Sequence, residues 1–376
     1  MTNPDIDEDA LGMWEPYFYL LLLLFLLIHQ HVRRCHLPPG PPPIPLIGNM
    51  ISLATGHFDA RLQKWRDEYG EVFTLWIGPI PIIFVCSLQQ MRRFFVQKAE
   101  IFSNRWRNHV TDTFMGGHYG VVQTDGQLWR EQRRFSLRIL RDFGVGRPEI
   151  EASITKETYH MISFLSSSSS SLSPSTPIAI CVGNVINDLL FGKTFPQGSH
   201  QMQSLHNLLD AHSELVLHPL MGLYISFPFS THIPLINAPW KRLLAQRNAL
   251  WAFLDEQVEE HKKQFEEGSE WQMRMLLLDL FFAGMETTVT TLKWAFLLVA
   301  SHPEVQSRVQ SEIDSHVIGR VTLSHRKELP YTSATICEIQ RIANILPINL
   351  LRTAAEDWRE GEWKEEVNCP DLVPWV

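Results

Sequence analysis

An unbroken apolar run near the N-terminus constrains the fold of this chain more than any other feature. Residues 17 to 28 read YFYLLLLLFLLI, and the run extends back to Leu11 with only Glu15 and Pro16 interrupting it. A helix that spans a bilayer core needs about 20 predominantly apolar residues. The run is therefore long enough to predict a single membrane helix within residues 1–36.

The charges beside this run predict its orientation. Acidic residues precede it and the pair Arg33 and Arg34 follows it. Positive charge stays on the cytosolic side, so the N-terminus is expected in the lumen and the rest of the chain in the cytosol. The alternative is a cleaved signal peptide, which normally has a basic start and a small-residue cleavage site, and neither is present. We therefore expect an uncleaved, single-pass anchor.

A proline-rich segment, LPPGPPPIPLIG, follows at residues 37–48. Proline fixes φ and lacks an N–H donor, so the segment ends the helix and predicts a stiff, extended spacer. A generic linker or a ligand for a polyproline-binding domain is the alternative. Its place just after a membrane helix favours a hinge that orients a globular domain on the membrane.

Composition narrows the class of protein. Hydrophobic residues make up 45% and charged residues 20%, which is typical of a folded chain. The net charge of -8 is the wrong sign for a nucleic-acid-binding protein. The five cysteines are an odd number without a C-x-x-C pair, which predicts reduced thiols rather than a disulfide framework or a zinc site.

Most of the globular part has apolar residues at helical spacing. Two β-rich runs, residues 71–78 and 80–85, predict a short hairpin. Helices are predicted over residues 91–98, 126–140, 240–265, 275–300, 303–314 and 332–345. The predicted fold class is mainly α with a minor β part.

The run from Met275 to Ala300 is long and apolar enough to be a second membrane helix. Three charged residues, Asp279, Glu286 and Lys293, argue against that alternative. Their spacing of seven places them on one face of a helix, as expected for a helix that crosses a protein core.

The centre of this run reads Ala283-Gly284-Met285-Glu286-Thr287-Thr288. A glycine leaves space beside the helix for a large group, and an acid next to a threonine can pass protons within an apolar wall. A polar cluster with purely structural partners is the alternative interpretation.

Two further helical motifs bear charge. Trp129 and Arg133 lie four residues apart, so one helical face presents two donors that can hold a carboxylate. An ordinary amphipathic helix is the alternative. Glu338 and Arg341 form an i, i+3 pair, which is also common on helix surfaces.

The order of these motifs resembles the cytochrome P-450 superfamily. A proline hinge, W-x-x-x-R, A-G-x-E-T-T, and E-x-x-R followed by residues 346–352, LPINLLR, occur here in the family's order. Residues 102–105 and 134–144 are similar to the microsomal family 2 type, which handles drugs, fatty acids and other lipophilic molecules. The resemblance implies a P-450 domain over residues 49–357 and a non-family tail over 358–376.

The resemblance also implies roles for individual residues. Haem propionates would be bound by Trp129, Arg133, Arg352 and Arg105. Ala283 and Gly284 would lie over the haem face, with Glu286 and Thr287 delivering protons to the reacting oxygen. Glu338 and Arg341 would form an internal ion pair that stabilises the fold. Phe114 would line the substrate pocket.

The implied activity is haem-thiolate monooxygenation, in which one oxygen atom from O2 enters a small lipophilic substrate. No nucleotide-binding glycine loop is visible, so electrons would come from NADPH-cytochrome P-450 reductase. The implied location is the endoplasmic reticulum membrane, with the catalytic domain cytosolic.

The sequence departs from the family in two places. No F-x-x-G-x-x-x-C-x-G segment follows Asp357, and Cys369 has no glycines around it, so no metal ligand is predicted. The connection between Phe265 and Met275 is also shorter than the family implies. The alternative function is therefore a catalytically inactive truncated isoform, or a gene-model fragment, that lacks the iron ligand.

Overall fold

The computed structural model describes residues 8–55, 57–167, 173–259, 270–355, 358–360 and 367–369, which belong to two compact units. Unit 1 contains residues 1–106, 219–230 and 349–376, and unit 2 contains residues 107–218 and 231–348. The described elements are mostly helices, with short strands confined to unit 1. The prediction of a mainly α fold with a minor β part is therefore confirmed.

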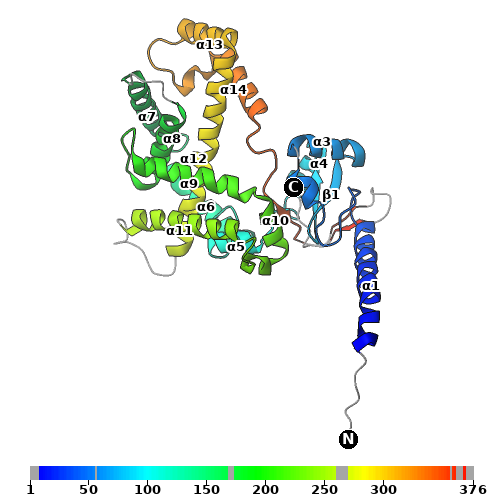
Figure 1. Ribbon diagram of the computed structural model, residues 1–376. Coiled ribbons are helices and arrows are strands. Elements are labelled where there is room, and N and C mark those ends of the chain that lie inside the picture. Colours follow the sequence, from blue (N-terminus) through cyan, green and yellow to red (C-terminus); the bar gives the residue numbers. More distant parts are fainter. Residues whose placement is uncertain are drawn as a thin grey trace. The chain divides into compact units, whose positions relative to one another are not determined.

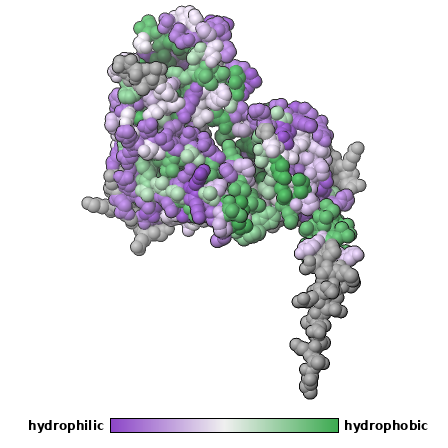
Figure 2. Space-filling model, viewed as in Figure 1, coloured by the Kyte–Doolittle hydropathy of each residue, from purple (hydrophilic) through white to green (hydrophobic). Residues whose placement is uncertain are grey.

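Unit 1 begins with α1, Glu8–Cys35, whose side chains from Tyr17 to Phe25 are exposed. Its part from Tyr17 to Cys35 is long and apolar enough to cross a membrane. The part of α1 drawn in colour in Figure 2 carries hydrophobic atoms. The other described elements of unit 1 are α2 Met50–Ala54, α3 Phe58–Tyr69, β1 Val72–Ile77, β2 Ile80–Val85, α4 Leu88–Arg92, the π-helical turn η1 Arg93–Gln97, β3 Asn104–Arg105, α10 Pro219–Ser226, β4 Arg352–Thr353, β5 Trp358–Glu360 and β6 Val367–Cys369.

The predicted hairpin is present as β1 and β2, which pair antiparallel from Val72 opposite Val85 to Ile77 opposite Ile80. Its buried residues join a core that includes Phe94 and Phe102. Val, Ile and aromatic residues pack well on a pleated surface, which explains why these runs form strands.

The proline-rich segment packs against this hairpin. Leu37 is buried, and the carbonyl oxygen of Pro39 accepts a hydrogen bond of 2.9 Å from the backbone N–H of Thr74. Gly48 bridges to Ile77 further along the segment. These contacts attach the predicted stiff spacer to β1, because its carbonyl oxygens remain acceptors even where proline removes donors.

Unit 2 is helical, and its long helix α12, Glu270–Ser301, packs against α8, Ser175–Phe191 (Figure 1). The other helices of unit 2 are α5 His109–Met115, α6 Gly126–Asp142, α7 Pro148–Ser167, α9 His200–Val216, α11 Ala238–Glu259, α13 Pro303–His316, the 3-10 helix η4 Leu323–Lys327 and α14 Pro330–Ala343. A second 3-10 helix, η2 Pro228–His232, begins in unit 1 and ends in unit 2.

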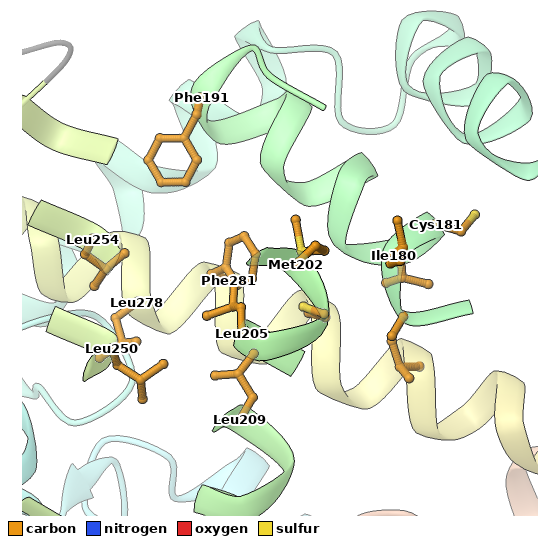
Figure 3. Packing of buried hydrophobic residues seen from close by; sticks show 14 of the residues in the cluster. Ile180, Cys181, Phe191, Met202, Leu205, Leu209, Leu250, Leu254, Leu278 and Phe281 are labelled. Atoms are coloured by element: carbon orange, nitrogen blue, oxygen red, sulfur yellow. The ribbon is translucent and has the colours of Figure 1, made fainter. Parts of the chain in front are cut away.

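The core of unit 2 is built by α8, α9, α11 and α12. Figure 3 shows Phe281 of α12 beside Met202 and Leu205 of α9. Because this core buries one side of α12, the helix belongs to a folded domain, as its charged face predicted. The predicted helix 126–140 is present as α6. Helix α11 is described to Glu259, so the predicted residues 260–265 lie outside the described part.

Candidate functional site

Two arginines face each other across the strand pair of unit 1. Arg105 of β3 and Arg352 of β4 are direct partners in an antiparallel register. Arg352 donates a hydrogen bond of 3.3 Å to the Phe102 carbonyl oxygen, and burial lowers the pKa of its guanidinium. Its Nε is buried without a hydrogen-bond partner among the described residues. Like charges directly opposite in a sheet are destabilising, so this pair suits a bound anion.

Helix α6 of unit 2 brings together the two predicted donors Trp129 and Arg133. The Arg133 guanidinium lies 5.4 Å from the centre of the Trp129 ring. Trp129 is half-buried and Arg133 is exposed. The arrangement follows from the i, i+4 spacing, and it presents an indole N–H and a guanidinium on one side of the helix.

On α12, the Thr287 hydroxyl donates a hydrogen bond of 2.6 Å to the carbonyl oxygen of Ala283. Ala283 is exposed, whereas a Cβ added at Gly284 would lie only 2.8 Å from Cδ1 of Ile186. The glycine therefore permits close packing of α12 against α8. The open surface beside α12 is at Ala283 and Thr287.

Glu286 lies on a different face of α12, in a cluster with His206 of α9. Glu286 Oε2 is 3.9 Å from His206 Nδ1, and Lys293 Nζ is 3.2 Å from His206 Nε2. Burial and the nearby Asp210 raise the pKa of Glu286, while burial and Lys293 lower the pKa of His206. The shared face of Glu286 and Lys293 was predicted from their spacing. The histidine between them was not.

Asp279, the first of the three charged residues on α12, holds the loop before α6. Its Oδ2 accepts hydrogen bonds of 2.6 and 2.9 Å from the backbone N–H groups of Val121 and Val122. Gln272, two turns earlier, both accepts from and donates to the backbone of Gly120. Burial raises the pKa of Asp279 to about 6. These contacts fix the position of residues 120–122 on α12.

Phe114, the predicted substrate-pocket residue, belongs to an aromatic cluster. Its ring stacks on His212 of α9 at 4.1 Å, and His212 meets the edge of Phe282 of α12 at 5.8 Å. His212 is buried, which lowers its pKa to about 4 and keeps the imidazole neutral. The cluster presents aromatic surface beside α12, as expected of a site for apolar molecules.

The predicted pair Glu338 and Arg341 forms on α14 with two bonds of 2.7 Å. The side chains are 53% and 71% exposed, respectively. An exposed ion pair of this kind contributes little to stability, since water and salt screen it.

Comparison with known proteins places the chain in a family. The profile of the cytochrome P450 family matches residues 38–277 and 266–362. Cytochrome P450 2J5 of Mus musculus is 32% identical over 379 residues, which cover 92% of this chain and 75% of the relative. Cytochrome P450 2A5 of Mus musculus and cytochrome P450 2B4 of Oryctolagus cuniculus are each 33% identical over 369 residues, covering 90% of this chain and 74% of each relative.

The chain belongs to the cytochrome P450 family, whose members are haem-dependent monooxygenases, and these relatives are family 2 members. Family membership and the class of activity inferred from the motif order are thus confirmed. The family's cofactor is haem, which supplies the oxidising chemistry when it is bound.

Each unit contains a pair of donors of the kind that binds carboxylates. The facing pair Arg105 and Arg352, with its buried Nε, and the α6 pair Trp129 and Arg133 all present N–H groups suited to propionates. Ala283 leaves an exposed surface on α12 where a flat macrocycle can pack.

Among the described residues, burial disfavours the thiolate form of two cysteines. Burial raises the pKa of Cys181 to about 11, so its thiol stays protonated, and burial also raises the pKa of Cys86. Cys35 is exposed at the end of α1 and Cys337 is exposed on α14. The side chain of Cys369 lies outside the described residues. Thiolate is the form of cysteine that ligates a metal, so Cys181 and Cys86 are poor candidates for the iron ligand.

Three residues in the contacts of α12 were not predicted from the sequence. His206 and His212 are on α9, and Gln272 is in the first turn of α12. The two histidines are six residues apart, a spacing that does not match the period of a helix. Their roles depend on which faces of α12 they contact.

Proposed function

We propose that these residues form the oxygen side of a monooxygenase site that acts on small lipophilic substrates. The observation that carries the proposal is the arrangement on α12. Thr287 and Ala283 border an open surface, and the residue that precedes Thr287 in the chain, Glu286, is a half-buried acid of raised pKa on the neighbouring face. An acid of raised pKa keeps its proton to a higher pH than a free glutamate does, which suits it to donate a proton. The aromatic cluster of Phe114, His212 and Phe282 supports an apolar substrate.

We also propose the position of this chain in the cell. The exposed apolar surface of α1, with acidic residues before it and Arg33 and Arg34 after it, supports a single-pass anchor in the endoplasmic reticulum with a cytosolic globular part. Electrons would come from NADPH-cytochrome P450 reductase.

A second proposal concerns the 376-residue polypeptide itself. Burial keeps the Cys181 thiol protonated, and the residues around Cys369 have none of the glycines that a ligand loop needs. We propose that this polypeptide, expressed alone, is catalytically inactive.

Binding of metal-free protoporphyrin IX tests the edge contacts without the iron. We expect saturable binding, measured by porphyrin fluorescence, that weakens about tenfold in Arg352→Gln and in Arg133→Gln. Each variant loses one charge-assisted contact, worth about 1.5–3 kcal/mol. Arg134→Gln, an exposed arginine next to Arg133, is the matched control and should bind as the wild type does.

Protoporphyrin dimethyl ester, which has the same ring without free carboxylates, is the control ligand. It should bind weakly and equally to all these proteins. Equal binding of acid and ester to the wild type would contradict the assignment of these residues to propionates.

A further inference from the structure

Unit 1 contains a pocket of about 250 Å³ at the junction of α1, the proline-rich segment and β1. The residues His31, Arg34, Cys35, Thr74 and Trp76 line it, together with residues 37–40. Since one water occupies about 30 Å³ in the liquid, the pocket has room for a phosphate group and its hydration.

The two arginines at the end of α1 have different partners. Arg33 Nη1 donates to the carbonyl oxygen of Pro79 at 2.8 Å, and its guanidinium lies 5.0 Å from the Trp76 ring. Arg33 thus joins α1 to the hairpin, whereas Arg34 borders the pocket.

Arg34 Nη2 donates to the carbonyl oxygen of Gly40 at 3.2 Å. Within the described part of the chain, Arg34 forms no ion pair with a carboxylate. A guanidinium carries five N–H donors in a fork that matches a phosphate. The single bond to Gly40 orients that fork at the pocket and neutralises none of its charge.

Thr74 provides the second polar group. Its side chain is buried, and its Oγ1 makes no hydrogen bond to the described residues. A buried hydroxyl without a partner costs about 1–3 kcal/mol, so its place beside a cation and a pocket suggests a ligand that completes it.

The position of the pocket indicates the source of that ligand. It lies at the basic end of the apolar helix α1, where a membrane anchor would meet the headgroup layer. The cytosolic leaflet is rich in anionic lipids, and each basic residue near its surface contributes about 1 kcal/mol of attraction.

We propose that this pocket binds the phosphate headgroup of an anionic lipid through Arg34 and Thr74. The proposal rests on the proposed anchoring of α1. Binding there would fix the angle between the anchor and the hairpin, because the lipid would contact α1, residues 37–40 and β1 together.

The test uses the full chain in dodecyl maltoside micelles, titrated calorimetrically with dihexanoyl phosphatidic acid. We expect saturable binding of one lipid per chain, weakened about tenfold in Arg34→Gln. Thr74→Val, which keeps the shape of the side chain, should weaken binding several-fold. Arg92→Gln removes the same charge from the exposed end of α4 in the same unit, and its affinity should equal that of the wild type.

Two other ligands identify the source of the phosphate. Dihexanoyl phosphatidylcholine has the same acyl chains and a zwitterionic headgroup, and it should bind at least tenfold more weakly. Inorganic phosphate that bound as tightly as phosphatidic acid would overturn the lipid assignment in favour of a free anion. Circular dichroism of each variant should match that of the wild type, so that lost binding reports on the site.

Absence of saturable binding in the wild type, or equal weakening by Arg92→Gln, would overturn the proposal. The anchoring of α1 is tested separately by protease protection of microsomes. A reversed orientation with intact binding in micelles would contradict the anchoring alone.

Discussion

Arg105 and Arg352 are direct cross-strand partners in the β3–β4 pair, so two guanidinium groups share one side of a two-residue ladder. The guanidinium carbon of Arg352 lies 5.7 Å from the centre of the Phe95 ring, and this contact holds the Arg352 side chain in place. A carboxylate that joins such a pair makes charge-assisted hydrogen bonds to both guanidinium groups.

Binding of a carboxylate by Arg105 and Arg352 should depend on the shape of the side chain at residue 352 as well as on its charge. Metal-free protoporphyrin IX should raise the melting temperature of the wild type, because a ligand that binds only the native state stabilises it. Arg352→Lys keeps the charge and loses the planar fork, so we expect less than half of that rise, measured by differential scanning fluorimetry. A full rise in Arg352→Lys would show that charge alone suffices.

Asp279 should give the stability a pH dependence of a definite sign. Its pKa in the folded chain is about 6, above its ordinary value of 3.8, so the native state binds the proton more tightly than the unfolded state. Stability should therefore fall as pH rises from about 4 to about 6, by on the order of 3 kcal/mol.

Asp279→Asn should remove this part of the pH dependence while keeping an acceptor for Val121 and Val122. The measurement is urea unfolding of both proteins between pH 4 and pH 7. Asp314→Asn, at an exposed position on α13, should keep the wild-type dependence. A parallel pH profile for wild type and Asp279→Asn would contradict the assignment.

His212 should give the stability a pH dependence of the opposite sign. Its folded-state pKa is about 4, below its ordinary value of 6.5, so the unfolded chain takes up a proton first as the pH falls. Stability is then lost between about pH 6.5 and pH 4. His212→Phe keeps aromatic contact with Phe114 and should remove this loss, whereas His200→Gln, at the exposed start of the same helix, should not. The same unfolding series measures both variants.

Much of the fold could be predicted because it depends on local pattern. Alternating and β-branched residues predict the hairpin of β1 and β2, and the apolar run with three charges on one face predicts α12. The spacing of seven also places Glu286 and Lys293 together, since it repeats nearly every two turns of helix.

The partners of those residues could not be predicted in the same way. His206 contacts Glu286 and Lys293 only because α9 packs on that face of α12, and the register of two packed helices is a tertiary property. The role of Gly284 likewise depends on Ile186 of α8, which no spacing within α12 reveals.

The orientation of α1 makes a further prediction for isolated microsomes. With Arg33 and Arg34 on the cytosolic side, protease should cleave the chain near Trp129 without detergent. Immunoblotting with an antibody to unit 2 reports the cleavage. Protection until detergent is added would mean that the globular part is lumenal.

The central proposal is that the 376-residue polypeptide, expressed alone, is catalytically inactive because its iron lacks a thiolate ligand. The most direct test is the reduced carbon monoxide difference spectrum of the purified chain after haem is added. We predict that the band characteristic of thiolate-ligated haem does not form, because Cys181 stays protonated and the segment around Cys369 lacks a glycine-rich loop. Appearance of that band, and its loss in Cys369→Ala, would contradict the account and identify Cys369 as the ligand.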